Sequence, residues 1–299
     1  TGLPRRPPAP GRAAPERGIT QRFPEGGIVV ATLSGVDGKG IVVTGGGGGL
    51  GSAMAAEFCR LGARVVVCGR TRERLEETVR RIDEELGEGR AFAVTADVRD
   101  PGSVAAMLDR ATELLGEVDG LVNNASGLFP VDAEKLTPNG FDAVVRIVLH
   151  GTWHCTSELG RRWLAAGRGG AVVNVLTPYA WMGAPGIVHN ASAKGGVLAM
   201  TRTLGAEWAG RGVRVNAIAP GWMPVGGTDF LAGDPQTRSR LIDAIPAGRL
   251  LRAEETARAA AYLLSDDASY VVGEVLTIDG GHHLSKGLYE FMDELPARR

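Results

Sequence analysis

A cluster of glycines near residue 45 has the spacing of a phosphate-binding turn. The apolar run IVVT leads directly into GGGGGLG, and a helical pattern starts there. The pattern T-G-x-x-x-G-x-G places its fixed residues at Thr44, Gly45, Gly49 and Gly51. Glycine tolerates positive φ and lets the backbone approach a pyrophosphate, while the start of a helix offers unpaired N–H groups. Because the pattern lies between a predicted strand and a predicted helix, it indicates a dinucleotide site rather than a flexible loop.

The next apolar run, RVVVCG, ends in a cation rather than a carboxylate. Gly69 closes this run and Arg70 follows it. An acidic residue at this point would accept hydrogen bonds from an adenosine ribose and disfavour a 2′-phosphate. A guanidinium can instead bind a phosphate with two hydrogen bonds and stack on adenine. The sequence therefore favours NADP(H) over NAD(H). The alternative is a surface arginine at a helix start, where its charge opposes the helix dipole.

The apolar pattern along the chain predicts the fold that positions these residues. Short apolar runs alternate with helical patterns from residue 38 onward. The seven runs are 41–44, 64–69, 91–98, 118–125, 171–176, 214–220 and 275–278. Continuous apolar runs are typical of strands buried on both faces, as parallel sheets require. We predict an α/β fold with one doubly wound Rossmann domain, built as a seven-stranded parallel sheet with helices on both faces.

The two ends of the chain differ in composition. Residues 1–34 are rich in Pro, Arg and Gly and lack apolar periodicity, so we expect an arm that is extended or disordered. The run IVVATL at 28–33 could add a short strand. Residues 35–299 contain no internal linker and are predicted to form the single oxidoreductase domain. Within it, a loop at about 222–250 is expected to select the substrate.

Composition excludes several classes of partner. A net charge near −1 gives no reason to expect nucleic acid or an anionic membrane. No run approaches the roughly 18 apolar residues of a membrane span, and the first residues lack the apolar core that is typical of a signal peptide. Cys59, Cys68 and Cys155 lie among apolar residues without metal-ligand spacing, and so we expect reduced core thiols and no metal. A cytoplasmic protein is predicted.

Taken together, the motifs resemble those of the short-chain dehydrogenase/reductase family. The matching segments are TGGGGGLG (44–51), ADV (96–98), NNAS (123–126), NASAKGG around Lys194, IAPG (218–221) and IDGG (278–281). The resemblance implies that Asp97 and Val98 contact adenine, and that Lys194 and Asn124 lie at the nicotinamide ribose. The cofactor-binding residues that we expect are Gly45, Gly47, Gly48, Gly49, Leu50, Gly51, Arg70, Asp97, Val98, Asn124, Ala125, Lys194, Pro220 and Gly221. The same resemblance implies a homotetramer or homodimer.

The catalytic residues depart from the common family pattern. The family has Tyr-x-x-x-Lys, but Asn190 stands four residues before Lys194. The usual serine is Thr177, and the usual helix asparagine is Val148. Another tyrosine, Tyr179, lies fifteen residues before the lysine. This arrangement, with IVLHGT (147–152) and IPAGRL (245–250), resembles the 2,4-dienoyl-CoA reductase branch.

A displaced tyrosine suits reduction of a conjugated alkene. Hydride added to a carbon remote from a thioester carbonyl leaves negative charge on the thioester oxygen, so a donor is needed at that oxygen. We predict that Tyr179 supplies this hydrogen bond and that Thr177 assists. We also expect the Lys194 ammonium to favour phenolate-like character through charge proximity. The alternative for Tyr179 is a buried aromatic that packs the loop.

The match to the branch is incomplete. The branch has a second donor, an asparagine, where this chain has Leu128, and its CoA-binding arginine is missing from TDFLAGDP at 228–235. Arg99 does match a branch arginine. His189 could reach the cleft. His150 and His154 have helical spacing, but no metal-ligating residue accompanies them. Three apolar residues flank the expected cleft and favour an apolar substrate: Trp181, Trp222 and Met223.

These residues are consistent with three functions. The first is NADPH-dependent reduction of a conjugated enoyl or dienoyl substrate, apolar and thioester-like. The second is a ketone/alcohol oxidoreductase that uses Tyr179 as a displaced acid. The third is a catalytically silent NADP-binding protein, suggested by the missing asparagine, tyrosine and second donor.

Overall fold

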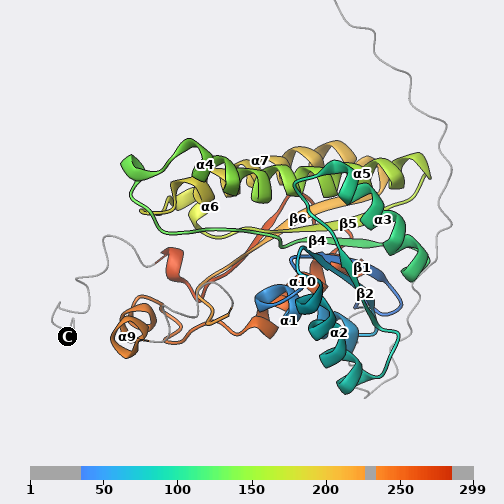
Figure 1. Cartoon of the computed structure of the whole chain (residues 1–299), viewed down its shortest axis with the longest axis horizontal. Coiled ribbons are helices and arrows are strands. Elements are labelled where there is room, and N and C mark those ends of the chain that lie inside the picture. Colours follow the sequence, from blue (N-terminus) through green and yellow to red (C-terminus); the bar gives the residue numbers. More distant parts are fainter. Residues whose placement is uncertain (1–34, 226–233, 285–299) are drawn as a thin grey trace, which may run out of the picture. The chain divides into compact units, whose positions relative to one another are not determined.

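Seven parallel strands form one sheet in the order β3-β2-β1-β4-β5-β6-β7 (Figure 1). The computed structural model describes residues 35–225 and 234–284. The strands are β1 (Gly40–Thr44), β2 (Arg64–Gly69), β3 (Ala91–Thr95), β4 (Gly120–Asn123), β5 (Gly170–Val175), β6 (Val213–Pro220) and β7 (Val275–Ile278). The predicted doubly wound fold is confirmed.

Helices cover both faces of the sheet (Figure 1). The α-helices are α1 (Gly49–Arg60), α2 (Arg72–Leu86), α3 (Pro101–Leu115), α4 (Pro138–Val145), α5 (Gly151–Ala165), α6 (Tyr179–Met182), α7 (Val188–Trp208), α9 (Pro235–Asp243) and α10 (Ala253–Leu264). A π-helical segment, Arg146–His150, joins α4 to α5. Short 3-10 turns occupy Ala133–Lys135, Ala209–Arg211, Asp266–Ala268 and His282–Leu284.

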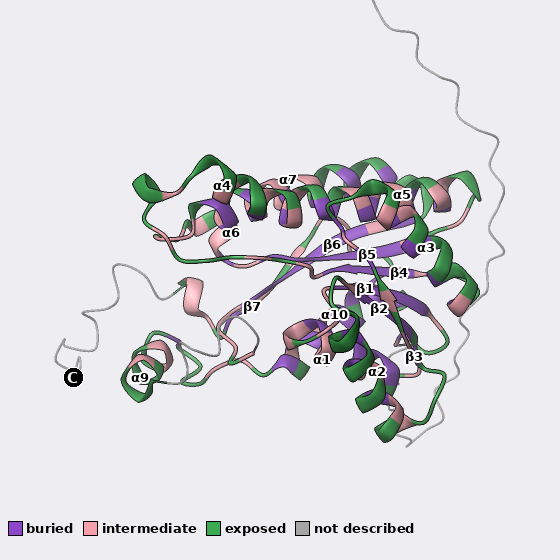
Figure 2. Cartoon of the chain, in the orientation of Figure 1, coloured by how far each residue is buried: buried purple, intermediate pink, exposed green. Residues whose placement is uncertain are grey.

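The buried core lies in layers on the two faces of the sheet. Successive residues of β1 alternate between them: Ile41 and Val43 pack with α1, α2 and α10, whereas Val42 packs with α3 and α5. This alternation follows from the two-residue period of a strand. Figure 2 shows the central strands β1, β4, β5 and β6 as almost continuously buried. The three cysteines are free and buried, as expected.

Three helices begin at a capping residue followed by proline. The side chains of Asp100, Thr137 and Asp234 each accept a backbone N–H from the first turn of α3, α4 and α9. Proline at the first helical position loses no helical hydrogen bond, and its fixed φ suits the helix. These local signals explain where the three helices start.

Two predicted strands end earlier in the structure than in the pattern. β3 ends at Thr95 and β4 at Asn123, so residues 96–98 and 124–125 are loops beyond the strand ends. The strand order reverses between β1 and β4, and in such sheets ligands bind outside the carboxyl ends at this point. The shortened strands therefore leave their polar loop residues free for a site there.

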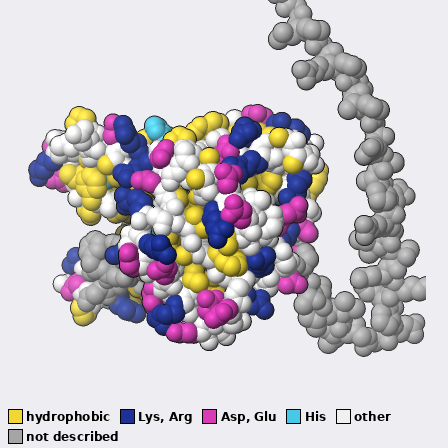
Figure 3. Space-filling model, turned by 45° about the vertical axis from the view of Figure 1, so that its right-hand side comes forward, with side chains coloured by type: hydrophobic (Ala, Val, Ile, Leu, Met, Phe, Trp, Pro, Cys, Tyr) yellow, Lys and Arg dark blue, Asp and Glu magenta, His cyan; other side chains and the backbone are white. Residues whose placement is uncertain are grey.

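Some expectations fall outside the described residues. These are the arm at 1–34 with its possible strand at 28–33, and part of the substrate loop, 226–233. Within the described residues no helix is long and apolar enough to cross a membrane. On the face shown in Figure 3, basic and acidic side chains are interspersed, in agreement with the small net charge of the whole chain.

Candidate cofactor and substrate site

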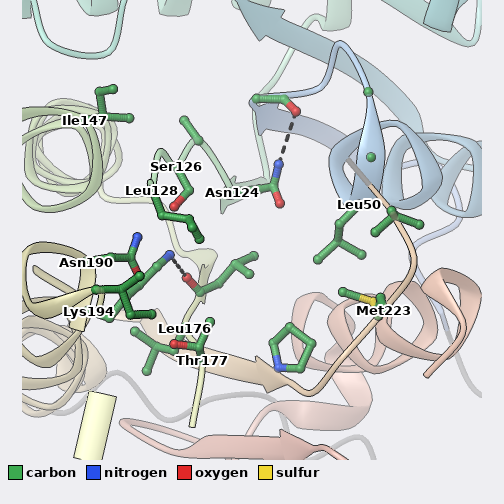
Figure 4. A pocket seen from close by; sticks show the side chains of 18 of the residues that line it. Leu50, Asn124, Ser126, Leu128, Ile147, Leu176, Thr177, Asn190, Lys194 and Met223 are labelled. Carbon is green, nitrogen blue, oxygen red and sulfur yellow. Dashed lines mark hydrogen bonds between the residues drawn. The ribbon is translucent and has the colours of Figure 1, made fainter. Parts of the chain in front are cut away.

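A cavity of about 910 Å³ opens at the carboxyl ends of the central strands. Thirteen of the fourteen predicted cofactor residues line it, together with Thr177 and Tyr179. Those thirteen are Gly45, Gly47, Gly48, Gly49, Leu50, Arg70, Asp97, Val98, Asn124, Ala125, Lys194, Pro220 and Gly221. Figure 4 shows side chains from α1, from the segments that follow β4 and β5, and from α7 around the same hollow.

Gly51 is the exception among the predicted residues. It does not line the cavity but lies beneath the turn, where an added Cβ would be 2.2 Å from the Gly45 carbonyl oxygen. Gly45 itself has φ 65°, a left-handed conformation that favours glycine. Gly51 is therefore needed for close packing of helix and strand, and its contact with the cofactor stays a prediction.

Asn124 fixes the shape of the glycine turn. Its Nδ2 donates to the carbonyl oxygens of Thr44 at 3.0 Å and Gly45 at 3.1 Å. In return, the Thr44 hydroxyl accepts the backbone N–H groups of Asn124 and Ala125, both at 3.0 Å. An added Cβ on Gly45 would lie only 3.0 Å from Ala125 Cα. A side chain at Gly45 would thus collide with the residues that follow β4, so glycine allows the turn to pack closely there. This turn, fastened by Asn124, forms a glycine cradle at the start of α1, where a pyrophosphate can bind.

The adenosine end of the cavity carries more positive than negative charge. Arg70 and Arg74 both line it, and Gly47 lies against Arg74, with an added Cβ 3.1 Å from Arg74 Cβ. Sequence reasoning missed Arg74, although its spacing of four from Arg70 at the start of a helix was the available signal. Two guanidiniums beside the glycine turn fit a phosphorylated ribose.

Asp97, which follows the neighbouring strand β3, also lines the cavity but is already paired. The Arg99 guanidinium donates to both of its carboxylate oxygens, at 2.5–3.0 Å, and so lowers the pKa of that carboxyl. Arg99 itself does not line the cavity. The Asp97 carboxylate is thus paired with Arg99, and the nearby charge of Arg70 also lowers its pKa.

Lys194 is a buried lysine with one protein partner for its ammonium. Its residue is 4% exposed, and Nζ donates to the carbonyl oxygen of Val175 at the end of β5 (Figure 4). Burial lowers the pKa of Lys194 to about 8. The alternative of a surface lysine is excluded, and an ammonium with hydrogens to spare faces the cavity.

Two hydroxyl groups follow β5. The Thr177 hydroxyl oxygen is buried and has no hydrogen-bond partner among the described residues. Tyr179 begins α6, so the predicted loop contains a short helix, and its ring packs edge-on against Trp222 with centroids 6.2 Å apart. Burial raises the pKa of Tyr179 to about 12. The expected phenolate-like character is therefore wrong, because desolvation dominates and the Lys194 ammonium is directed to a carbonyl.

The loop after β4 is fastened to the segment before Lys194. Asn190 donates from Nδ2 to the Gly127 carbonyl oxygen at 2.9 Å, and the Val131 N–H donates to the Gly186 carbonyl oxygen at 2.8 Å. Asn190 is 1% exposed and lines the cavity. These bonds connect the two walls of the far end of the cavity.

His189 does not reach the cleft. It is fully buried, both ring nitrogens lack a hydrogen-bond partner among the described residues, and Phe129 packs on it with ring centroids 4.5 Å apart. Burial lowers the pKa of this imidazole. It lies outside the cavity wall, so the suggestion that it reaches the cleft is wrong.

The far end of the cavity is mostly apolar. Its lining includes Leu128, Pro130, Ile147, Ala184, Pro185, Ile187, Trp222, Met223 and Val225. Trp222 and Met223 thus lie where the sequence suggested. Trp181 does not: it is 41% exposed and packs edge-on against His283 instead. Because apolar walls favour apolar ligands, this end suits a hydrocarbon-like substrate.

His150 ends the π-helical segment and His154 lies in the first turn of α5, with no metal-ligating group beside them in the described residues. His150 and His154 have ring centroids 6.3 Å apart, and Nδ1 of His154 hydrogen-bonds the Val98 carbonyl oxygen at 2.9 Å. Among residues 35–225 and 234–284, no cluster of three or more His, Cys, Asp or Glu could hold a metal. His154 thus joins α5 to the loop after β3.

A doubly wound parallel sheet with this glycine cradle, paired with a buried lysine, defines a nicotinamide-dependent oxidoreductase. The model of a family described as enoyl-(acyl carrier protein) reductase matches residues 45–283. The chain belongs to the short-chain dehydrogenase/reductase family.

Relatives of known name fall into two groups. A Bacillus subtilis protein named "Probable 2,4-dienoyl-CoA reductase" is 43% identical over 83% of this chain and 97% of its own length. The 2-dehydro-3-deoxy-D-gluconate 5-dehydrogenase of Escherichia coli is 32% identical, over 82% of this chain and 96% of the relative. The shared fold thus accompanies both thioester and sugar-acid substrates.

Solved structures agree with the fold. A short chain dehydrogenase from Bacillus anthracis has a TM-score of 0.75 and 41% identity, covering 84% of this chain and 99% of the other. A structure from Agrobacterium tumefaciens with bound NADP has a TM-score of 0.78 and 33% identity, with coverage of 85% and 100%. A Brucella melitensis 3-ketoacyl-(acyl-carrier-protein) reductase complexed with NADH has a TM-score of 0.74 and 32% identity, covering 83% of this chain and 99% of the other. Both cofactors therefore occur among similar structures.

Proposed function

We propose that the protein uses NADPH to reduce a carbon–carbon double bond conjugated to a carbonyl, most suitably that of an enoyl or dienoyl thioester. The observation that carries the proposal is the position of Tyr179. Its ring lines the cavity with Lys194 and Thr177, while an amide, Asn190, replaces the usual tyrosine. The resemblance to the Bacillus subtilis relative named as a dienoyl-CoA reductase supports the same chemistry.

We propose that residues lining the cavity hold NADPH. The glycine turn and the start of α1 suit the pyrophosphate, and Arg70 with Arg74 suits the 2′-phosphate. Lys194 would hold the nicotinamide ribose with hydrogens that Val175 leaves free. When bound, NADPH supplies the hydride to the carbon remote from the carbonyl, and a proton from water, added to a carbon nearer the carbonyl, completes the reduction.

Tyr179 would hydrogen-bond the substrate's carbonyl oxygen as a neutral phenol. A pKa near 12 keeps its proton in place at neutral pH, so the hydroxyl donates throughout the reaction. Negative charge grows on the carbonyl oxygen as the double bond is reduced, and the bond strengthens with it. One such donor stabilises the transition state by about 3 kcal/mol. The Trp222 ring holds the phenol in orientation.

Thr177 would act beside the tyrosine. Its buried hydroxyl lacks a partner among the described residues, which is costly unless a ligand provides one. Because it lies two residues before Tyr179 and lines the same cavity, it can bind either the substrate oxygen or the cofactor's nicotinamide end.

A second candidate is a ketone/alcohol oxidoreductase. The 32% identity to a sugar-acid dehydrogenase favours it, and Tyr179 would then donate its proton to a reduced carbonyl oxygen. The apolar lining of the far end weighs against a polyhydroxylated substrate.

Oxidation of NADPH against three thioesters separates these candidates. Crotonyl-, 2,4-dienoyl- and 3-oxoacyl-thioesters are offered in parallel, and products are identified by mass and chromatography. The proposal expects turnover with the first or second and a product that keeps its carbonyl. Turnover of the 3-oxoacyl substrate alone, with an alcohol as product, would replace the proposal with the second candidate.

A further inference from the structure

A buried amide lies in the wall of the cavity one helical turn before Lys194. Asn190 is 1% exposed, yet it lines the cavity. Figure 4 shows it on α7 with Lys194, close to Leu128 of the loop after β4. A polar side chain so deeply buried normally has its hydrogen-bonding groups satisfied, because an unmade bond costs free energy.

The amide has one protein partner and unused capacity. Nδ2 donates to the Gly127 carbonyl oxygen at 2.9 Å, and this bond also fixes which end of the amide is nitrogen. An amide nitrogen carries two hydrogens, and the bond to Gly127 uses one of them. Within the described residues nothing accepts the second hydrogen, and nothing donates to Oδ1.

The cavity wall beside Asn190 includes an apolar residue of the loop after β4. Leu128 is 46% exposed in the cavity wall and can donate nothing. Tyr179 reaches the cavity from α6, which packs directly against α7. A growing negative charge on a carbonyl oxygen is commonly held by two donors that are fixed in advance. Asn190 is fixed in this way, because its bond to Gly127 sets the plane of the amide.

We propose that the second Nδ2 hydrogen of Asn190 binds the substrate's carbonyl oxygen together with the Tyr179 hydroxyl. The inference rests on the proposed function, since it names a second group at the same oxygen. An asparagine suits the position because one hydrogen can hold the loop while the other binds substrate. A serine has a single O–H and can do only one of these at a time.

The test compares Asn190→Leu with Asn139→Leu. The two exchanges are chemically identical, but Asn139 is exposed on α4, away from the cavity. Losing a donor to the growing charge predicts that kcat of Asn190→Leu on crotonyl-CoA falls by about 100-fold, with NADPH affinity unchanged. Asn139→Leu keeps the wild-type rate. Asn190→Ser, which can keep the loop bond, serves as a second variant in case the leucine variant does not fold.

A spectroscopic measurement separates binding of the oxygen from mere fastening of the loop. trans-Cinnamoyl-CoA is bound to the protein with NADP⁺, and its ultraviolet absorption is compared with that of the free thioester. Two donors on the carbonyl oxygen shift the band to longer wavelength, and the proposal expects a smaller shift in both Asn190 variants. A loop-fastening role alone would raise KM or lower stability and leave the shift unchanged, which overturns the inference.

A double variant distinguishes failure of the proposed function from failure of the role proposed for Asn190. If both donors bind one oxygen, Tyr179→Phe and Asn190→Leu combined lose less than the product of their separate losses, because neighbouring groups couple. Unchanged turnover in Tyr179→Phe contradicts the proposed function. A large loss in Tyr179→Phe with wild-type kcat and band position in both Asn190 variants contradicts only the role of Asn190.

Discussion

The two ends of the cavity are built in different ways. At the dinucleotide end, backbone does most of the positioning: Gly45 has positive φ, Gly51 leaves no room for a Cβ, and Asn124 fastens β1 to β4. At the substrate end, side chains from the loop after β4, from α6 and from α7 meet, and each contributes one or two groups. The first end tolerates almost no change, whereas the second can be altered residue by residue. Members of one family can therefore share a cofactor cradle and differ in substrate.

The largest expected effect is at Gly51. A Cβ there would lie 2.2 Å from the Gly45 carbonyl oxygen, so Gly51→Ala must displace the turn. We expect the free energy of unfolding to fall by about 3 kcal/mol and NADPH binding to be lost. Denaturant unfolding and cofactor fluorescence measure both. Gly210→Ala is the matched control, because nothing lies within 4 Å of an added Cβ there. Equal behaviour of the two variants would refute the packing role of Gly51.

Next in size is the effect of Arg70 on the choice of cofactor. Arg70→Glu replaces a phosphate-binding cation with a carboxylate that can accept ribose hydroxyls. Because a hydrogen bond to a charged group contributes about 1.5–3 kcal/mol, NADPH affinity should fall by about 10- to 100-fold and NADH affinity should not. Calorimetric titration with each cofactor provides the measurement. Arg81→Glu, an exposed exchange on α2 away from the cavity, is expected to change neither affinity.

These two sites also show how much of the molecule the sequence could predict. The cradle was predictable because glycines, β-branched strands and a helix start encode it within a few dozen consecutive residues. Asp97 and Lys194 followed from the family resemblance. Arg74 and Asn190 were missed as site residues because their importance depends on which distant segment lies opposite: Gly47 for one and Gly127 for the other.

Other errors have the same cause. The sequence placed both Trp181 and Trp222 at the cleft, but only the latter turns inward, since α6 carries Trp181 out toward His283. The high pKa of Tyr179 depends on burial by residues from several elements. The roles of individual site residues, NADP specificity, the cytoplasmic location and the homo-oligomeric state stay predictions.

A smaller effect is expected from the protonation of Lys194. Its pKa is lowered to about 8, so the ammonium is present below pH 8 and is lost as pH rises through that value. NADPH affinity should therefore decline above pH 8, by about 10-fold if one charge-assisted hydrogen bond is lost. Fluorescence titrations from pH 6 to about pH 10 measure the decline. Lys194→Met should bind weakly without this pH dependence, and Lys135→Met, an exposed exchange, should retain it. A decline that persists in Lys194→Met would assign the titration to another group.

The smallest expected effect concerns His189, beside the substrate end. Burial lowers the pKa of His189 in the folded chain, so the unfolded state binds more protons in the window between the two pKa values. Stability from this residue is present above the unfolded pKa of about 6.5 and is lost as pH falls below it. Thermal unfolding should show a shallower loss of Tm toward acid in His189→Leu than in the wild type. Identical slopes would indicate that the imidazole gains solvent or a partner without unfolding.

The central claim is that Tyr179 holds the substrate's carbonyl oxygen, and one kinetic comparison tests it most directly. Single-turnover oxidation of enzyme-bound NADPH by crotonyl- or dienoyl-CoA is followed in the wild type, in Tyr179→Phe and in Tyr270→Phe, whose tyrosine is fully exposed. The account predicts a loss of at least about 100-fold in Tyr179→Phe, unchanged NADPH affinity, and the wild-type rate in Tyr270→Phe. Wild-type turnover in Tyr179→Phe would contradict it, although the dinucleotide cradle would still stand.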